Sequence, residues 1–175
     1  SNKHKLRGIK MVNKELMEDF ETEFEKIKQE LGFKATLKEL ESVFFLRDFI
    51  HATKFVSSSL SRQVCGRICE TFKGWSGYLH GIVMPVPHSM YSVTENNMFD
   101  DDNKKEIMLI MKKIMEFTSR SALIGLTKDK KAEAEFIDET FKFWNDELNV
   151  LLEKTMSKVN QGWKKQIDEH DLEQE

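Results

Sequence analysis

Met84-Pro85-Val86-Pro87-His88 holds both prolines of this 175-residue chain. Proline inside a helix removes a backbone hydrogen bond and clashes with the preceding turn. Because no proline lies elsewhere, the sequence on either side is free to form long helices, and apolar residues at helical spacing fill most of it. The sequence therefore predicts an all-α fold, a single helical bundle of about five helices with antiparallel neighbours.

The prolines open a connection from Met84 to Asn103 that has no clear periodicity. We expect it to be one long loop between the third and fourth helices, within which short helical turns are compatible with the sequence. Long connections in compact domains are often functional or mobile.

Two helices are predicted before Ser57. The first begins near Asn13, a good cap residue, and ends at Gly32. The second opens with Thr36-Leu37-Lys38-Glu39, which has the pattern of a capping box. Apolar residues lie on nearly every side of this second helix as far as Val56, which is typical of a central helix packed on all sides.

The third helix follows Ser57-Ser58-Ser59, a run that either caps it or bends one continuous rod. Its glycines fall away from the apolar stripe and predict either close approach of another backbone or fraying near Gly74. The stripe comprises Leu60, Val64, Ile68, Phe72, Trp75, Leu79 and Ile82, and the glycines are Gly66, Gly74, Gly77 and Gly81.

The fourth helix is predicted to start around Asp102 or Asn103 and to end near Gly125. The fifth starts near Thr127 and reaches about 35 residues, or about 50 Å. Trp144 and Trp163 lie on it, each either in the core or at an interface. Trp163 lies beyond the reach of the shorter helices and is the best candidate for a contact between subunits.

The predicted organisation is a basic N-terminal tail at 1–12, a helical bundle domain at 13–167 and an acidic C-terminal tail at 168–175. The formal net charge of −3 disfavours general affinity for nucleic acid. No apolar run approaches the roughly 20 residues of a membrane span. Two cysteines and no secretory signal predict a cytoplasmic protein.

No motif of known catalytic mechanics is present, and no cofactor is expected. Cys65, Cys69 and His80 fall short of the ligand number and spacing of zinc sites, so core cysteines are the favoured interpretation. Glu95, Asn96 and the aspartates 100–102 lack the pattern of a calcium loop, and a solvated acidic cap is favoured there. No metal site is predicted.

Arginine is the best signal of a site. Four of the five arginines lie in apolar helices, namely Arg47, Arg62, Arg67 and Arg120. Arginine suits a partly buried ion pair or a bidentate grip on an anion. Arg47 and His51 lie four apart on one helical face and are the candidate catalytic pair, although an internal ion pair and a satisfied interior histidine explain them as well.

Three functions are compatible with these features. The first is a non-enzymatic interaction or oligomerisation module of a cytoplasmic assembly, as a homodimer or with a protein partner. The second is a nucleic-acid-binding accessory protein, based on the basic N-terminus and the internal arginines. The third is an enzyme that acts on a small anionic substrate through Arg47 and His51, with Arg62 or Glu70, provided that these groups converge.

Overall fold

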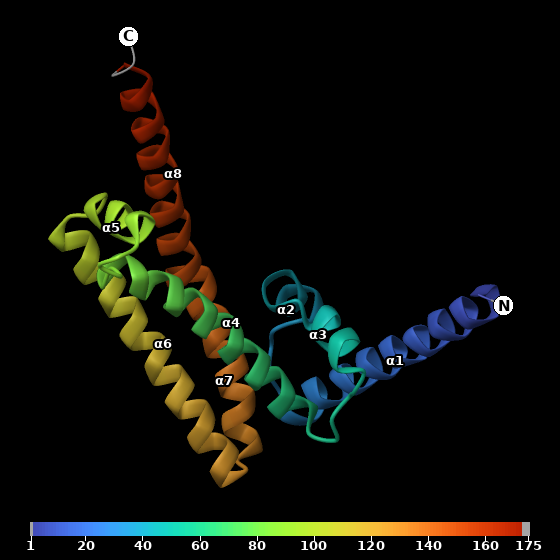
Figure 1. Ribbon diagram of the computed structural model, residues 1–175. Helices are drawn as coiled ribbons and strands as arrows, with labels where there is room; N and C mark the ends of the chain where they lie inside the picture. Colours follow the sequence, from blue (N-terminus) through green and yellow to red (C-terminus); the bar gives the residue numbers. More distant parts are fainter. Residues whose placement is uncertain (1, 173–175) are drawn as a thin grey trace. The chain divides into compact units, whose positions relative to one another are not determined.

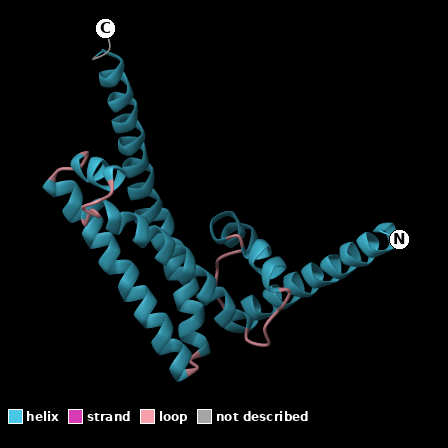
Figure 2. Cartoon of the chain, viewed as in Figure 1, coloured by secondary structure: helices cyan, strands magenta, loops and turns pink. Residues whose placement is uncertain are grey.

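The computed structural model describes the backbone of residues 2–172 and the side chains of residues 13–170. All regular elements in this part of the chain are helices, and it contains no strand (Figures 1 and 2). The predicted all-α class is therefore confirmed. No helix among these residues combines the length and the apolar character needed to cross a bilayer.

The helices are more numerous than the sequence predicts. Because α7, η1 and α8 follow one another without a break, residues 2–172 form seven helical rods, and the predicted count of about five is wrong. The bounds are α1 (Asn2–Leu31), α2 (Leu37–Phe44), α3 (Leu46–Thr53), α4 (Leu60–Val83), α5 (Met90–Asn97), α6 (Asp101–Thr127), α7 (Lys130–Phe143), the π-helical η1 (Trp144–Leu148) and α8 (Asn149–Leu172).

The chain divides into two compact units. Unit 1 comprises the residues up to Thr71 together with Phe117–Phe141, and unit 2 comprises Phe72–Glu116 together with the residues from Lys142 onward. Helices α4, α6 and α7 each contribute residues to both units. The predicted limits of the bundle domain and its two tails stay a prediction, and the side chains of the basic residues at 1–12 lie outside the described residues.

Helix α1 begins at Asn2, so the start predicted at Asn13 is wrong. Asn13 is a favourable cap residue, but it does not interrupt the helix, because the residues on both sides of it also favour helix. The C-terminus agrees with the prediction, because Gly32 has a φ of 77° and its N–H donates to the Lys28 carbonyl at 2.9 Å.

The second predicted helix is two helices. The capping box is present, since the Thr36 N–H donates to the Glu39 carboxylate at 2.8 Å and the Glu39 N–H to the Thr36 hydroxyl at 3.2 Å. Phe45 then adopts a left-handed conformation (φ 51°), and the Glu41 carboxylate caps α3 by accepting from the Arg47 N–H at 2.8 Å. Each short helix buries its own face against α1, which explains the apolar residues on all sides without a central helix.

Helices α3 and α4 are separate, because the chain leaves α3 at Lys54 (φ 54°) and the Ser59 carbonyl accepts the first N–H groups of α4. The predicted stripe of α4 is buried at every position except Trp75, which is half-buried. Its glycines meet neither expectation. Helix α4 is intact through Gly74, and no heavy atom lies within 4 Å of a Cβ built at Gly66, Gly74, Gly77 or Gly81.

The long loop predicted at Met84–Asn103 is also wrong, because α5 forms inside it. Two short connections remain, residues 84–89 and 98–100. Ser89 caps α5 by accepting from the Ser92 N–H at 3.3 Å, and the Asp100 carboxylate caps α6 by accepting from the Asn103 N–H at 2.8 Å. A run of eight residues with no buried side chain carries no periodic signal that marks it as a helix.

The long last helix predicted by the sequence is present as the continuous run from α7 to α8. Along this run, the buried residue after Phe143 is Leu148, five positions later. The spacing of five coincides with the π-helical turn η1, whose hydrogen bonds join residues five apart. The buried aromatic residue here is Phe143, whereas Phe141 and Trp144 are half-buried.

Unit 1 is held together across a long separation in sequence by Asp138. This α7 carboxylate accepts from the Lys34 N–H at 2.8 and 2.9 Å and from the Ala35 N–H at 2.9 Å, in the turn between α1 and α2. Beside the turn, Phe24 meets Phe33 edge-on with ring centroids 5.6 Å apart. The core of unit 1 includes Phe20, Phe24, Leu40, Phe44, Ile50, Ile68 and Phe136.

Replacement of Gly77 by alanine is expected to stabilise the protein by about 0.5–1 kcal/mol, because an exposed helical glycine loses backbone entropy and its Cβ position is open. Urea denaturation followed by circular dichroism measures the change. Gly32→Ala is the matched control and should destabilise, since alanine is strained at a φ of 77°. Equal effects of the two substitutions would contradict this account of the glycines.

Asp138→Ala is expected to lower the free energy of unfolding by about 2 kcal/mol, since it removes the acceptor of two backbone N–H groups. Glu135→Ala, which removes only an exposed pair with Lys131 on the same helix, should change it by less than about 0.5 kcal/mol. Chemical denaturation of both variants tests this, and a small effect at Asp138 would show that the turn does not depend on the carboxylate.

Candidate functional site

Helix α5 is held to the end of α4 by its polar side chains. The last carbonyls of a helix have no partner within the helix. Asn96 donates to the Ile82 carbonyl at 2.6 Å, and Ser92 donates to the Gly81 carbonyl at 3.3 Å. The Ser92 hydroxyl also accepts from the Val86 N–H at 2.9 Å. Ser92, Glu95 and Asn96 share one helical face, and this polar face points into unit 2.

The segment from Met84 to Val93 also carries apolar side chains to solvent, and on α5 Met90 and Val93 lie opposite the polar face. The exposed fractions are 62% at Met84, 57% at Val86, 66% at Met90, 68% at Tyr91 and 36% at Val93. We call these five residues the Met84–Val93 surface. Single exposed apolar residues are ordinary on proteins, but a cluster of them on an ordered segment marks an interaction site. The packing is thus the reverse of that of an ordinary surface helix.

Glu95 joins three helices of unit 2. Its carboxylate accepts from the Trp163 indole N–H at 3.0 Å and from the Tyr78 hydroxyl at 3.3 Å, which links α5 to α8 and α4. The Tyr91 ring lies against Trp163 with centroids 5.9 Å apart. Burial and the Glu95 charge both disfavour the phenolate, and they raise the pKa of Tyr78 to about 12.

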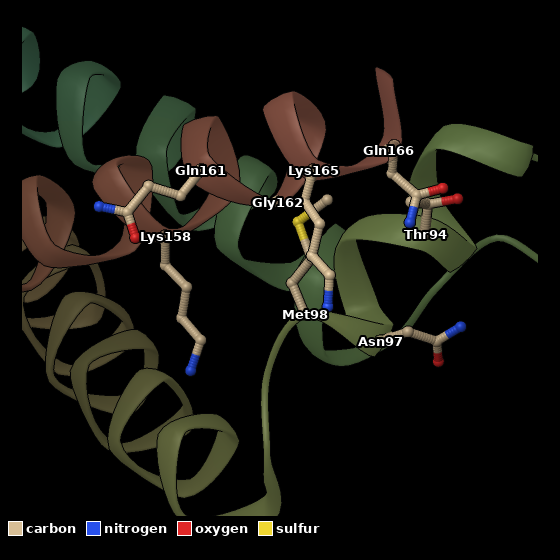
Figure 3. Close-up of a pocket in the computed structure, with 8 residues that line it drawn as sticks. All are labelled: Thr94, Asn97, Met98, Lys158, Gln161, Gly162, Lys165 and Gln166. Carbon is tan, nitrogen blue, oxygen red and sulfur yellow. The ribbon is translucent and has the colours of Figure 1, made fainter. Parts of the chain in front are cut away.

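A cavity of about 540 Å³ lies beside this cluster, between α5 and α8 (Figures 1 and 3). We call it the α5–α8 cavity. A volume of this size is in the range of small-ligand pockets. Its lining contains two lysines, three side-chain amides and a hydroxyl, and no carboxylate. The lining residues are Thr94, Asn97, Met98, Lys158, Gln161, Gly162, Lys165 and Gln166.

The two lysines extend in the same direction from α8 in Figure 3. Lys158 is held in place, because its ammonium donates to the Asn103 side-chain oxygen at 2.7 Å and lies 5.4 Å from the centroid of the Phe99 ring. Lys165 pairs with Glu169 at 3.7 Å in an exposed ion pair, which contributes little and is easily exchanged.

Gly162 has a packing role. A Cβ at this position would overlap the thioether of Met98, so the absence of a side chain lets Met98 lie against α8 (Figure 3). The glycine does not end the helix, because α8 continues to Leu172.

The predicted pair Arg47 and His51 lies on α3 in unit 1. The Arg47 guanidinium forms an ion pair with Glu21 of α1. The backbone N–H of Arg47 donates to the Glu41 carboxylate. His51 is exposed. Arg47 is therefore bound by carboxylates of the protein, as the structural interpretation of the arginines expects.

The other predicted arginines bind separate groups of unit 1. Arg62 donates to the Ser121 hydroxyl at 3.0 Å, with its guanidinium against Gly125. Arg67 donates to the Phe44 carbonyl at 2.8 Å and lies 3.5 Å from the Glu70 carboxylate. Arg120 pairs with Glu139 and stacks on Phe117. The contacts of Arg47, Arg62 and Arg67 lead to three different groups, so these contacts do not bring the three arginines to a common partner.

A buried polar cluster in unit 1 has residue types known from catalysis. The Ser61 hydroxyl donates to the Glu133 carboxylate, which also binds Lys130 at 3.2 Å. Ser61 and Glu133 are each only 2% exposed, so a substrate cannot reach the hydroxyl. Cys65 lies beside them, and burial, followed by the Glu133 charge, raises the pKa of its thiol, which therefore stays protonated and unreactive at neutral pH.

The predicted interface tryptophans are both half-buried. Trp144 lies in η1, and Trp163 faces α5, a helix that the sequence did not reveal. Among residues with described side chains, no three His, Cys, Asp or Glu lie together so as to hold a metal ion. Cys65 and Cys69 are buried, whereas His80 is exposed.

The sequence analysis did not single out Tyr78, Lys158 or Lys165, and it assigned Glu95 to a solvated acidic cap, whereas Glu95 binds Tyr78 and Trp163. One signal was present on α8, where the face that carries Leu148, Leu152 and Val159 continues as Gly162 and Gln166. A polar continuation of an apolar stripe indicates that the face leaves the core and borders a solvated space.

No protein-family model, no curated protein and no solved structure matches this chain. The site therefore has to be interpreted from its own geometry.

Tyr78 is expected to ionise near pH 12, because burial and Glu95 disfavour its phenolate. The Tyr91→Phe variant leaves Tyr78 as the sole tyrosine, and its absorbance at alkaline pH measures the titration. The stabilisation linked to this shift is complete below about pH 10 and is lost as the pH rises to about 12. Glu95→Gln should lower the pKa of Tyr78, whereas Glu30→Gln, in unit 1, should leave it unchanged. An unchanged pKa in Glu95→Gln would refute the contact.

Proposed function

We propose that this chain is a non-enzymatic protein-interaction module that self-associates through the Met84–Val93 surface. The observation that supports this most is the reversed packing of α5. Its serine, glutamate and asparagine are bonded inward, while Met90 and Val93 face solvent and Tyr91 is largely exposed beside Trp163. Burying such side chains against another protein is the direct way to remove their apolar area from water.

The segment is ordered before any partner binds. Hydrogen bonds from Ser92 to the Gly81 carbonyl and from Asn96 to the Ile82 carbonyl hold it to α4, and the Tyr91 ring rests on Trp163. An ordered surface loses less conformational entropy on association than a mobile loop. Methionine side chains adapt to irregular partners, which suits a surface that has to fit.

A second copy of the chain is the occupant that we propose. In a twofold dimer the same patch contacts itself, so an apolar patch is complementary to its own copy without any further feature. The patch carries no charged side chain between Met84 and Val93, and self-pairing therefore brings no like charges together.

The enzyme and nucleic-acid hypotheses gain less support. Arg47 is engaged by Glu21, Arg67 by a backbone carbonyl and Arg120 by Glu139, so an anionic substrate or phosphate would have to displace a protein group at each. Paired guanidinium groups of this kind serve to join helices.

Self-association is expected in light scattering, with an average mass that rises from one chain toward two as the concentration increases. Replacing Val86 and Met90 with serine should weaken it at least about tenfold, because each removes exposed apolar area from the patch. Both side chains are exposed, so the fold should be retained, and circular dichroism checks this.

Leu126→Ser is the matched control, since Leu126 is 81% exposed but lies in unit 1, far along the chain from the patch. It should leave the association unchanged. A protein that stays monomeric at all concentrations, or one that responds equally to both sets of substitutions, would rule out the proposal.

A further inference from the structure

The α5–α8 cavity has a cationic lining in a chain whose formal net charge is −3. Lys158 and Lys165 supply ammonium groups, and Asn97, Gln161 and Gln166 supply side-chain amides that can donate hydrogen bonds. Since no carboxylate lines the space, the lining complements an anionic group.

The spacing of the lysines indicates what shape of anion fits. They are seven residues apart on α8, which places them two turns or about 10 Å apart along one face of the helix. Because Asn103 and the Phe99 ring hold the Lys158 ammonium, an anion with two acidic groups contacts both lysines without displacing it. An acidic segment that runs along α8 presents carboxylates at this separation, either seven residues apart in a helix or three apart in an extended strand.

The two lysines are prepared for different parts of this contact. Lys158 is fixed by Asn103 and by the Phe99 ring and has ammonium protons left to donate. Lys165 has only an exposed partner, Glu169, which an incoming carboxylate can replace at small cost. Between them, Gly162 leaves the Met98 thioether as an apolar contact for a side chain of the segment.

From this geometry we infer that the α5–α8 cavity binds an acidic segment of a protein partner, with carboxylates about 10 Å apart that contact Lys158 and Lys165. The inference goes beyond self-association, and its test has a separate readout. Nucleic acid fits less well, because its backbone carries a phosphate at every nucleotide and only two lysines line the cavity.

The test titrates the whole ¹⁵N-labelled chain with a 15-residue oligo-glutamate at low ionic strength. The probe carries carboxylates at every spacing, so it meets the lysines in any register. We expect the side-chain amide signals of Asn97, Gln161 and Gln166 to shift, because these groups line the cavity. Replacing both Lys158 and Lys165 with glutamine should weaken binding at least about tenfold, since it removes both cations that face the segment.

Lys164→Gln is the matched control, because Lys164 is exposed on the same helix but does not line the cavity. It should change binding less than twofold. A neutral Gly-Ser peptide of the same length should cause no shifts. The inference is overturned if oligo-glutamate leaves the three amides unshifted, if the lysine double variant binds as tightly as the original chain, or if a 15-nucleotide oligothymidylate binds the cavity more tightly. A failure of this kind leaves the light-scattering result intact, so the two proposals fail separately.

Discussion

The hydrogen bond from Asn96 to the Ile82 carbonyl is the contact on which the rest of unit 2's surface depends. The prolines at 85 and 87 stop α4 and leave its last carbonyls without helical partners. The polar face of α5 supplies those partners and so holds α5 against the end of α4. Thr94, Asn97 and Met98, which form one side of the α5–α8 cavity, lie on the segment that this bond orders.

This arrangement explains why an apolar surface can stay exposed. In most helices the apolar face drives packing and the polar face meets water. Helix α5 is ordered by hydrogen bonds to otherwise unpaired carbonyls and by the Glu95 contacts with Tyr78 and Trp163, so its apolar side chains are not needed for its own folding. They remain available for a partner, which connects the local hydrogen bonding to the proposed function.

Unit 1 uses its polar groups differently. Asp138 binds backbone N–H groups 103 and 104 residues away along the chain, Arg67 binds the carbonyl of Phe44 just before the left-handed break, and Glu133 binds Ser61. Each contact satisfies a group that would otherwise be unpaired at a helix end or in the core. Arginines that stand out in the sequence as possible ligands thus act as connectors between helices.

Hydrophobic periodicity and cap residues determined the helical class, the buried stripe of α4, the capping box at Thr36 and the end of α1 at Gly32, because these depend on neighbours within one or two turns. Tertiary structure alone decided the break at Phe45, where Glu41 caps the next helix, and the existence of α5, whose polar side chains bind another helix. It also decided the candidate site, since Glu95 and Trp163 meet across 68 residues of chain. Such contacts produce no periodic pattern in the sequence, because the residues come together only after the helices have packed.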